Sequence, residues 1–225
     1  MPSPVEGSYP WPFDGRLEKD NTALLIVDMQ VDFCAPGGWL DQLGVDLMAL
    51  RRPIEPLRRV LNAVRASGFR SIYVRESYRP DLSDLNRTKL WRTTHRGVAI
   101  GATGANGRVL VRGQPGTDIV PELVPEPGEP VIDKPGISGF YASELEQVLR
   151  GQGVRNLIVG GVTAEGSVQA TLRDANDRGY ECLLLEDCCG SAVPQDGKAT
   201  LEMLGILNGL YGSITRSSVL LEVIE

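Results

Sequence analysis

The 225-residue chain is long enough to bury one sizeable hydrophobic core, and its composition shows no break that marks a second domain. Its 23 Lys and Arg residues against 29 Asp and Glu residues give a net charge of −6, which disfavours general attraction to nucleic acid or to acidic membranes. No signal-like segment opens the chain, and no apolar run is long enough to span a bilayer. We therefore expect a cytoplasmic protein with neither a nucleic-acid partner nor a membrane partner.

The first 20 residues are rich in Pro and aromatic side chains, and we predict that they form an arm before a single domain over residues 21–225. Tyr9, Trp11 and Phe13 lie close together in this arm, and exposed together they would be prone to association. The arm is therefore expected to pack on the body of the protein or on a neighbouring subunit. On this basis we expect a homo-oligomer, either a dimer or a tetramer.

Short apolar runs alternate with helical patterns along the rest of the chain. This alternation predicts an α/β fold, a three-layer α-β-α sandwich around a mostly parallel, doubly wound sheet of about six strands. Helices are predicted over residues 54–67, from Ser143 with Glu146 completing a capping box, from Ser167 to about residue 178, and over 198–207. Strands are predicted at residues 23–27, 71–76, 131–133, 157–161, 181–186 and 213–215.

Residues 77–129 interrupt this alternation. Their Gly, Pro and Arg content indicates an excursion over the carboxyl edge of the sheet, where such segments form lids and subunit contacts. The only histidine, His95, lies here, and we interpret it as a structural loop residue rather than a catalytic one. The four cysteines, at positions 34, 182, 188 and 189, follow neither a disulfide nor a zinc pattern and are expected to be reduced.

Three chemically capable side chains stand at predicted strand ends or helix starts. Asp28 ends the first apolar run, Lys134 ends the run before Pro135, and Ser167 stands on the first turn of a helix. Each has a simpler explanation: a strand-ending Asp often binds loop amides, a strand-ending Lys is usually solvated, and a Ser often caps a helix. Ligands of parallel sheets gather at the carboxyl ends of the strands. Together the three residues therefore indicate a catalytic group.

The order and spacing of these segments resemble the isochorismatase-like cysteine hydrolases from about Asn21 to Gly212. The matching segments are Val27-Asp28-Met29-Gln30 with Asp32-Phe33, then Lys134-Pro135, then Gly161-Val162-Thr163 leading to the Ser167 helix. Other segments are similar to biuret hydrolases and their ureido-cleaving relatives, namely Tyr9-Pro10-Trp11-Pro12, Arg75-Glu76 with Arg79-Pro80-Asp81-Leu82, and residues 175–190.

The resemblance implies a catalytic triad of Asp, Lys and Cys. Asp28 and Lys134 match it, whereas Ser167 stands where the family carries Cys. A Ser hydroxyl is far harder to ionise than a Cys thiol, whose ordinary pKa is about 8.5. We interpret Ser167 as a Cys that has been replaced to trap a bound substrate. The alternative is a native Ser167 in an inactive or serine-using paralogue.

The resemblance further implies hydrolysis of a C–N amide bond in a small ureido compound, such as biuret or guanylurea, through a covalent acyl-enzyme without metal or cofactor. It implies an oxyanion hole from the backbone N–H groups of Thr163 and Ser167, with a cis peptide at Val162-Thr163. The alternatives to this function are a catalytically silent binding paralogue, and an enzyme with nicotinamidase or isochorismatase activity. The substrate-binding candidates are Gln30, Phe33, Phe140, Tyr141, Glu165, Leu207 and Asn208.

Three of these candidates bear on which ureide is cleaved. Leu207, or Asn208 if the register shifts by one, occupies the region where biuret hydrolases present a Gln, which argues against biuret itself. Glu165 is placed to pair with a guanidinium-like end, which favours a guanyl-substituted or carbamoyl-substituted urea.

Overall fold

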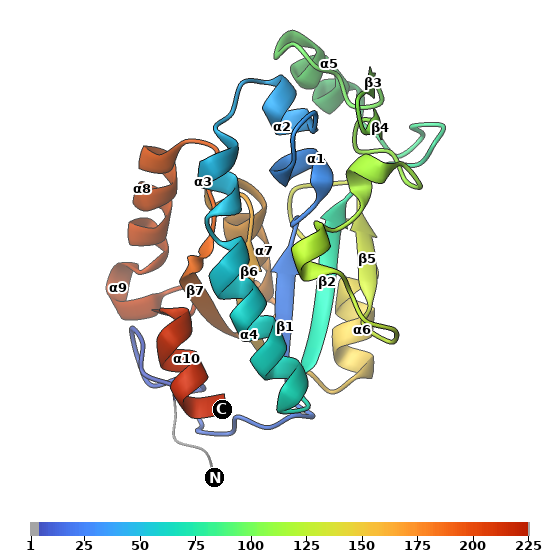
Figure 1. Ribbon diagram of the computed structural model, residues 1–225. Coiled ribbons are helices and arrows are strands. Elements are labelled where there is room, and N and C mark those ends of the chain that lie inside the picture. Colours follow the sequence, from blue (N-terminus) through green and yellow to red (C-terminus); the bar gives the residue numbers. More distant parts are fainter. Residues whose placement is uncertain (1–4, 225) are drawn as a thin grey trace.

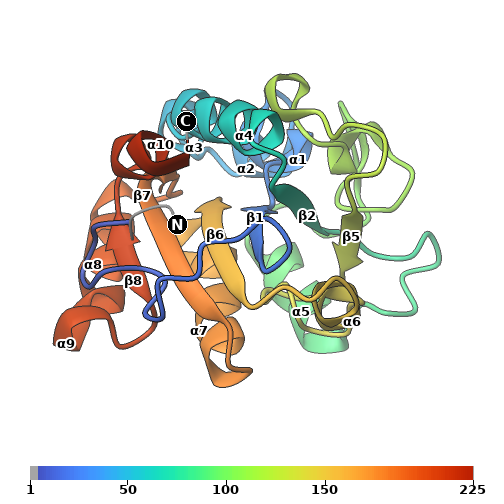
Figure 2. The ribbon, with the colours of Figure 1, turned by 90° about the horizontal axis from the view of Figure 1, so that it is seen from below.

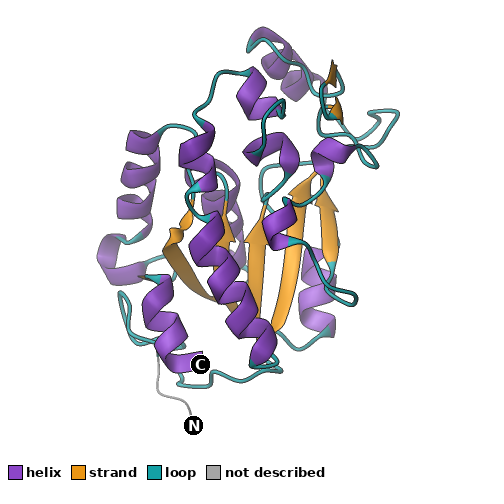
Figure 3. Ribbon diagram, viewed as in Figure 1, coloured by secondary structure: helices purple, strands orange, loops and turns teal. Residues whose placement is uncertain are grey.

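A computed structural model describes residues 5–224 and contains the predicted α/β fold, with a sheet whose six strands are all parallel (Figures 1 and 3). The strand order is β5-β2-β1-β6-β7-β8, so the first strand lies inside the sheet. A separate antiparallel pair, β3 (Thr103–Gly104) and β4 (Gly107–Arg108), lies in the excursion. The six strands are β1 (Thr22–Val27), β2 (Arg70–Glu76), β5 (Val131–Lys134), β6 (Asn156–Gly161), β7 (Glu181–Cys189) and β8 (Ser213–Thr215).

The continuous apolar run of β1 is explained by its burial on both faces. Leu24 and Ile26 point into one hydrophobic cluster, while Leu25 and Val27 point into the other. Figure 2 shows a layer of helices on each face of the sheet. Helices α4 (Ile54–Ala66) and α10 (Ser217–Ile224) contribute to the first cluster, and α6 (Leu145–Gly151) and α7 (Gln169–Asp177) to the second. The three-layer prediction is therefore confirmed.

Two helix predictions need correction. Helix α6 begins at Leu145 rather than Ser143, and the predicted capping box is absent because Glu146 bonds to Arg150 at 2.9 Å instead. Helix α8 (Pro194–Leu204) stops short of Leu207, because the chain turns through left-handed φ values of 51° and 59° at Leu207 and Asn208. Helix α10 has no counterpart among the predicted helices.

The excursion carries a helix that the sequence patterns did not predict. Helix α5 (Arg87–His95) lies beyond the carboxyl ends of the strands (Figure 1). His95 is its last residue rather than a loop residue, and its Nδ1 lies 2.8 Å from the carbonyl oxygen of Trp91. The remaining short elements are α1 (Val31–Cys34), α2 (Trp39–Gln42), α3 (Leu47–Arg51), η1 (Pro115–Thr117), η2 (Pro121–Leu123), η3 (Ala164–Val168) and α9 (Ile206–Gly209).

Residues 6–9 of the predicted arm lie against the β7–β8 edge of their own chain, whereas residues 16–19 contact the starts of β6 and β2. The Ser8 N–H donates to the carbonyl oxygen of Ile214 at 3.1 Å, and the Tyr9 hydroxyl donates to Glu181 Oε1 at 3.0 Å. Trp11 is fully buried, whereas Phe13 stays exposed. Packing against its own subunit covers most of the aromatic surface of the arm. Between residues 5 and 224 no helix combines the length and the apolar character that crossing a membrane requires.

Candidate active site

The structure brings Asp28, Lys134 and Ser167 together at the carboxyl edge of the sheet. Lys134 Nζ donates to Asp28 Oδ2 at 2.8 Å, to the carbonyl oxygen of Gly136 at 2.9 Å and to Ser167 Oγ at 3.4 Å. Asp28 and Lys134 are completely buried, and Ser167 is nearly so. Because all three ammonium donors are used, the buried charge of Lys134 is satisfied and its position is defined.

The Asp28 carboxylate is held on both sides. Its Oδ1 accepts the backbone N–H of Glu76 at 2.9 Å, while Oδ2 faces Lys134. Burial raises the pKa of Asp28 above its ordinary value; the Lys134 charge opposes this shift, and the Glu76 carboxylate adds to it. A carboxyl group that takes up a proton more readily than usual is suited to moving a proton during a reaction.

The turn that carries Ser167 begins where β6 meets β1. Gly161 has a φ of 140°, and a Cβ there would lie 2.0 Å from the carbonyl oxygen of Val27, so only glycine permits this approach. A cis peptide joins Val162 and Thr163, and the π-helical turn η3 then presents Ser167. The Thr163 N–H donates no hydrogen bond to any residue from 5 to 224. An unpaired backbone donor is what an oxyanion site requires.

Ser167 faces a cavity of about 650 Å³. Phe33 and Tyr141, two of the predicted substrate-binding residues, line it, as does the predicted oxyanion residue Thr163. The side of the cavity away from the sheet edge is formed by α5, which contributes Lys89, Arg92 and Thr93, with Asn86 just before it and Arg96 just after it. The remaining lining residues are Trp39, Leu40, Leu43, Glu76, Pro135, Gly136, Ile137, Ser138, Gly166, Asp174 and Ala192.

Three predicted substrate-binding residues are placed in the protein interior or in loop contacts instead. The Gln30 amide donates to the carbonyl oxygen of Glu76 at 3.0 Å, so this side chain braces the strand end. Phe140 packs in the core against Tyr180, with ring centroids 5.8 Å apart. Glu165 accepts the backbone N–H of Ala192 at 2.8 Å through Oε1 and does not line the cavity.

The predicted pair Leu207 and Asn208 lies outside the cavity as well. Leu207 is 82% exposed on the short helix α9, and neither residue belongs to the cavity lining. The two successive left-handed residues direct the chain away from the end of α8. Within this chain, contact of Leu207 or Asn208 with a ligand at Ser167 is no longer expected.

Sequence reasoning missed Glu76 and helix α5. Glu76 was visible as an acid at the carboxyl end of a predicted strand, the same signal that identified Asp28 and Lys134. The start of α5 also carried a signal, because Asn86 caps it by accepting the Lys89 N–H at 2.7 Å. The position of α5 over the cavity had no local signal in the sequence.

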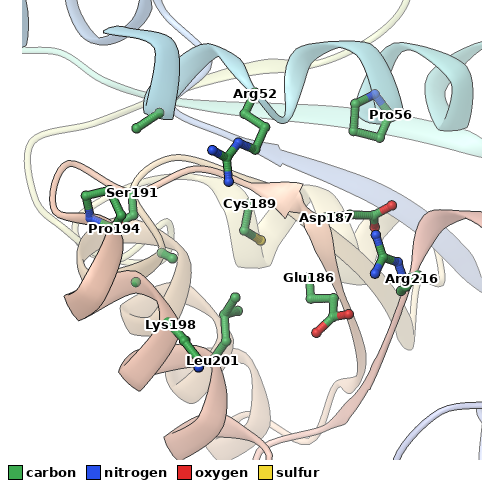
Figure 4. Close-up of a pocket in the computed structure, with 13 residues that line it drawn as sticks. Arg52, Pro56, Glu186, Asp187, Cys189, Ser191, Pro194, Lys198, Leu201 and Arg216 are labelled. Atoms are coloured by element: carbon green, nitrogen blue, oxygen red, sulfur yellow. The ribbon is translucent and has the colours of Figure 1, made fainter. Parts of the chain in front are cut away.

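A second cavity, of about 540 Å³, is lined by a free cysteine, Cys189 (Figure 4). Arg52, Lys198 and Arg216 surround it with Glu186 and Asp187. The Cys189 thiol donates to the carbonyl oxygen of Leu185 at 3.3 Å, and burial raises its pKa to about 12. Burial likewise raises the pKa of Cys34 to about 12. These thiols are therefore not activated to replace a cysteine nucleophile at position 167.

No metal-binding group emerges from the described residues: within 5–224, no three or more His, Cys, Asp and Glu side chains are arranged to hold an ion.

Comparison with known proteins identifies a matching family and several relatives. Residues 22–212 match the family model described as the Isochorismatase domain. Ureidoacrylate amidohydrolase RutB of Methylorubrum extorquens is 33% identical over 185 residues, covering 79% of this chain and 73% of the relative. A cysteine hydrolase structure from Pseudomonas syringae pv. phaseolicola 1448A has a TM-score of 0.78 and 25% identity, covering 98% of this chain and 96% of that one. N-carbamoylsarcosine amidase from Thermoplasma acidophilum has a TM-score of 0.66 and 26% identity, covering 88% and 96%.

Proposed function

This chain belongs to the isochorismatase family and is an amidohydrolase of that family, and from this premise we propose that its site cleaves a C–N bond of a small ureido compound through a covalent intermediate at position 167. The observation that carries the proposal is the position of Lys134 Nζ, 2.8 Å from Asp28 Oδ2 and 3.4 Å from Ser167 Oγ at the edge of the cavity. A cation that contacts both a carboxylate and the nucleophile position favours an anion at each.

With cysteine at position 167, the reaction follows from these contacts. Asp28 takes the thiol proton, and the Lys134 charge lowers the thiol pKa. The thiolate attacks the ureido carbonyl carbon, and the backbone N–H groups of Thr163 and residue 167 receive the negative charge that develops on the carbonyl oxygen. Asp28 then protonates the departing amine as the C–N bond breaks. Water adds to the thioester-like intermediate and releases the acid with the free thiol.

We propose that the present Ser167 is a replacement of that cysteine, which leaves a chain that binds substrate without turning it over. An Asp and Lys pair that forms a thiolate has too little driving force to form a serine alkoxide. A native Ser167 in a silent binding paralogue is the competing hypothesis.

The test is the rate of ammonia release after Ser167→Cys. We expect an increase of at least about a thousandfold on the preferred ureido substrate, because the thiolate is the missing reactant. Ser167→Ala is the matched control and should remain at the rate of the unmodified chain. An unchanged rate in Ser167→Cys would show that position 167 is not a disabled cysteine site.

Two cations, Arg92 on α5 and Arg96 directly after it, favour a substrate that carries an anionic end. Arg92 and Arg96 lie one helical turn apart, both line the cavity, and neither forms a salt bridge with a described residue between 5 and 224. Ureidoacrylate and N-carbamoylsarcosine, named in the two relatives, each combine a ureido group with a carboxylate. We therefore propose that N-carbamoyl acids are better substrates than biuret, triuret or guanylurea. Rates for all four classes with the Ser167→Cys protein test this ranking.

We also propose that the protein is a homo-oligomer. Apolar side chains on α9 and directly after it remain exposed in the single chain, with Ile206 at 43%, Leu207 at 82% and Leu210 at 46%. Light scattering after size-exclusion chromatography measures the assembly directly, and a monomer mass would refute this proposal.

A further inference from the structure

Glu76 is an acid on the cavity wall with one occupied and one open oxygen. It ends β2, and its side chain is only 6% exposed. Oε1 accepts the Tyr78 hydroxyl at 2.9 Å and Lys89 Nζ at 2.5 Å. Oε2 lies 4.0 Å from Lys134 Nζ, beyond hydrogen-bond distance, and accepts no hydrogen bond from residues 5–224. Since Glu76 lines the cavity, the open oxygen is available to a ligand there.

Oε2 borders the cavity and is not fully buried, so a ligand that supplies an N–H group takes the place of solvent as its donor. A carboxylate accepts hydrogen bonds and donates none, so it favours N–H donors over carbonyl, ester or methyl groups. The Tyr78 and Lys89 contacts hold the carboxylate in place before a ligand arrives. The site is therefore preorganised to accept from a donor.

The open oxygen and the nucleophile position border the same ammonium group. Lys134 Nζ lies 4.0 Å from Glu76 Oε2 and 3.4 Å from Ser167 Oγ. In a carbamoyl group, the terminal NH2 is bonded directly to the carbonyl carbon that a nucleophile would attack. We propose that Glu76 accepts a hydrogen bond from this terminal NH2, so that the pocket selects ureides over amides of the same shape. This inference rests on the proposed function, whose substrate class it makes more specific.

Glu165 provides the contrast. It also lies close to the nucleophile in sequence, and its Oε2 is likewise without a hydrogen-bond donor from residues 5–224. Its Oε1, however, accepts the Ala192 N–H, and its side chain does not line the cavity, so a ligand there does not reach it. The acid predicted from sequence to face substrate is thus replaced by one that ends a neighbouring strand. Glu165→Gln is accordingly a matched control for Glu76→Gln, because both remove one negative charge near Ser167.

The experiment compares dissociation constants, measured by calorimetry, for ligands in which CH3 replaces NH2. The pairs are N-carbamoyl-β-alanine with N-acetyl-β-alanine, and biuret with N-acetylurea. The chain is used with Ser167 as it stands, so binding is measured without turnover. We expect the carbamoyl member of each pair to bind roughly tenfold to a hundredfold more tightly, as for a lost hydrogen bond to a charged group. In Glu76→Gln this preference should fall below about threefold, and in Glu165→Gln it should persist.

Several results would overturn the inference. Equal affinity for NH2 and CH3 ligands on the unmodified chain would do so without any variant, which covers the case in which Glu76→Gln fails to fold. A preference that survives in a folded Glu76→Gln protein, or an absence of binding by all four ligands, would also refute it. Because no hydrolysis is measured, a chain that shows the preference yet stays inactive after Ser167→Cys would refute the proposed reaction and support the role of Glu76.

Discussion

The two sides of the active-site cavity are built differently. On the sheet side, Asp28 and Lys134 are completely buried and joined at 2.8 Å. On the opposite side, α5 and the residue that follows it present Arg92 and Arg96, which are exposed side chains without a salt-bridge partner in residues 5–224. Rigid strand ends hold the groups that must be placed within an ångström, whereas a surface connection supplies groups that distinguish ligands.

One ion pair joins the two sides. Lys89 of α5 reaches Glu76 at the end of β2 at 2.5 Å, and the Lys89 ammonium also lies 5.3 Å from the Tyr78 ring centroid. If the comparison holds, changes on the sheet side should abolish turnover, and changes on α5 should alter which substrates are preferred.

The largest effects are expected on the sheet side, in the Ser167→Cys background. Asp28→Asn removes the proton carrier and should lower turnover roughly a hundredfold to ten-thousandfold while leaving ligand affinity nearly intact.

Lys134→Ala, in the same Ser167→Cys background, should raise the pH at which the introduced thiol is alkylated, because the neighbouring positive charge is lost. It should also reduce the free energy of unfolding by about 3–5 kcal/mol, since it leaves Asp28 buried and unpaired. Near-parental turnover in both variants would contradict the assigned roles.

A smaller and selective effect is expected on α5. Arg92→Gln combined with Arg96→Gln should raise KM for N-carbamoyl acids about tenfold, since two cations near a carboxylate are lost, and should leave KM for biuret within about twofold. Added salt should weaken binding of the acids to the parent more than to the double variant. Arg87→Gln, on the same helix but not lining the cavity, is the control. Equal loss for charged and neutral substrates would argue against anion recognition by α5.

Next in size is a pH effect on stability from Asp32, which accepts the Leu110 N–H at 2.7 Å. Burial raises the pKa of Asp32 to about 6, against an ordinary value near 4 in the unfolded chain. Between about pH 4 and 6 the folded chain therefore retains a proton that the unfolded chain has released, and stability falls as pH rises. Asp32→Asn removes this dependence. Its Tm should rise relative to the parent across that window, and a constant difference in Tm would contradict the pKa shift.

The smallest effect is expected at Leu207. Because this side chain is 82% exposed and outside the cavity, Leu207→Gln should change KM for biuret by less than about twofold. The sequence resemblance suggested a larger effect, because biuret hydrolases present a Gln in this region. A large gain in biuret hydrolysis would restore that interpretation and would place Leu207 near a cavity of another subunit.

Several features of the fold and site could be predicted because they depend on local sequence patterns. The apolar run of β1 predicted a strand buried on both faces, and the polar residues after such runs predicted the edge where Asp28, Lys134 and Ser167 meet. Local patterns predicted less well where a side chain could form more than one contact. Ser143 and Glu146 have the spacing of a capping box, yet Glu146 pairs with Arg150 and the helix begins at Leu145.

The parallel α/β sheet and the meeting of its strand ends follow from the sequence alone, because hydrophobic periodicity and right-handed crossovers leave few other arrangements. Tertiary packing, in contrast, places Glu76 rather than Glu165 on the cavity wall and sets the position of α5. Those outcomes depend on side-chain direction and on contacts between segments far apart in the chain, such as Lys89 with Glu76 and Gln30 with the Glu76 backbone. No local pattern encodes such contacts, since their energies arise only after the sheet and its loops have packed.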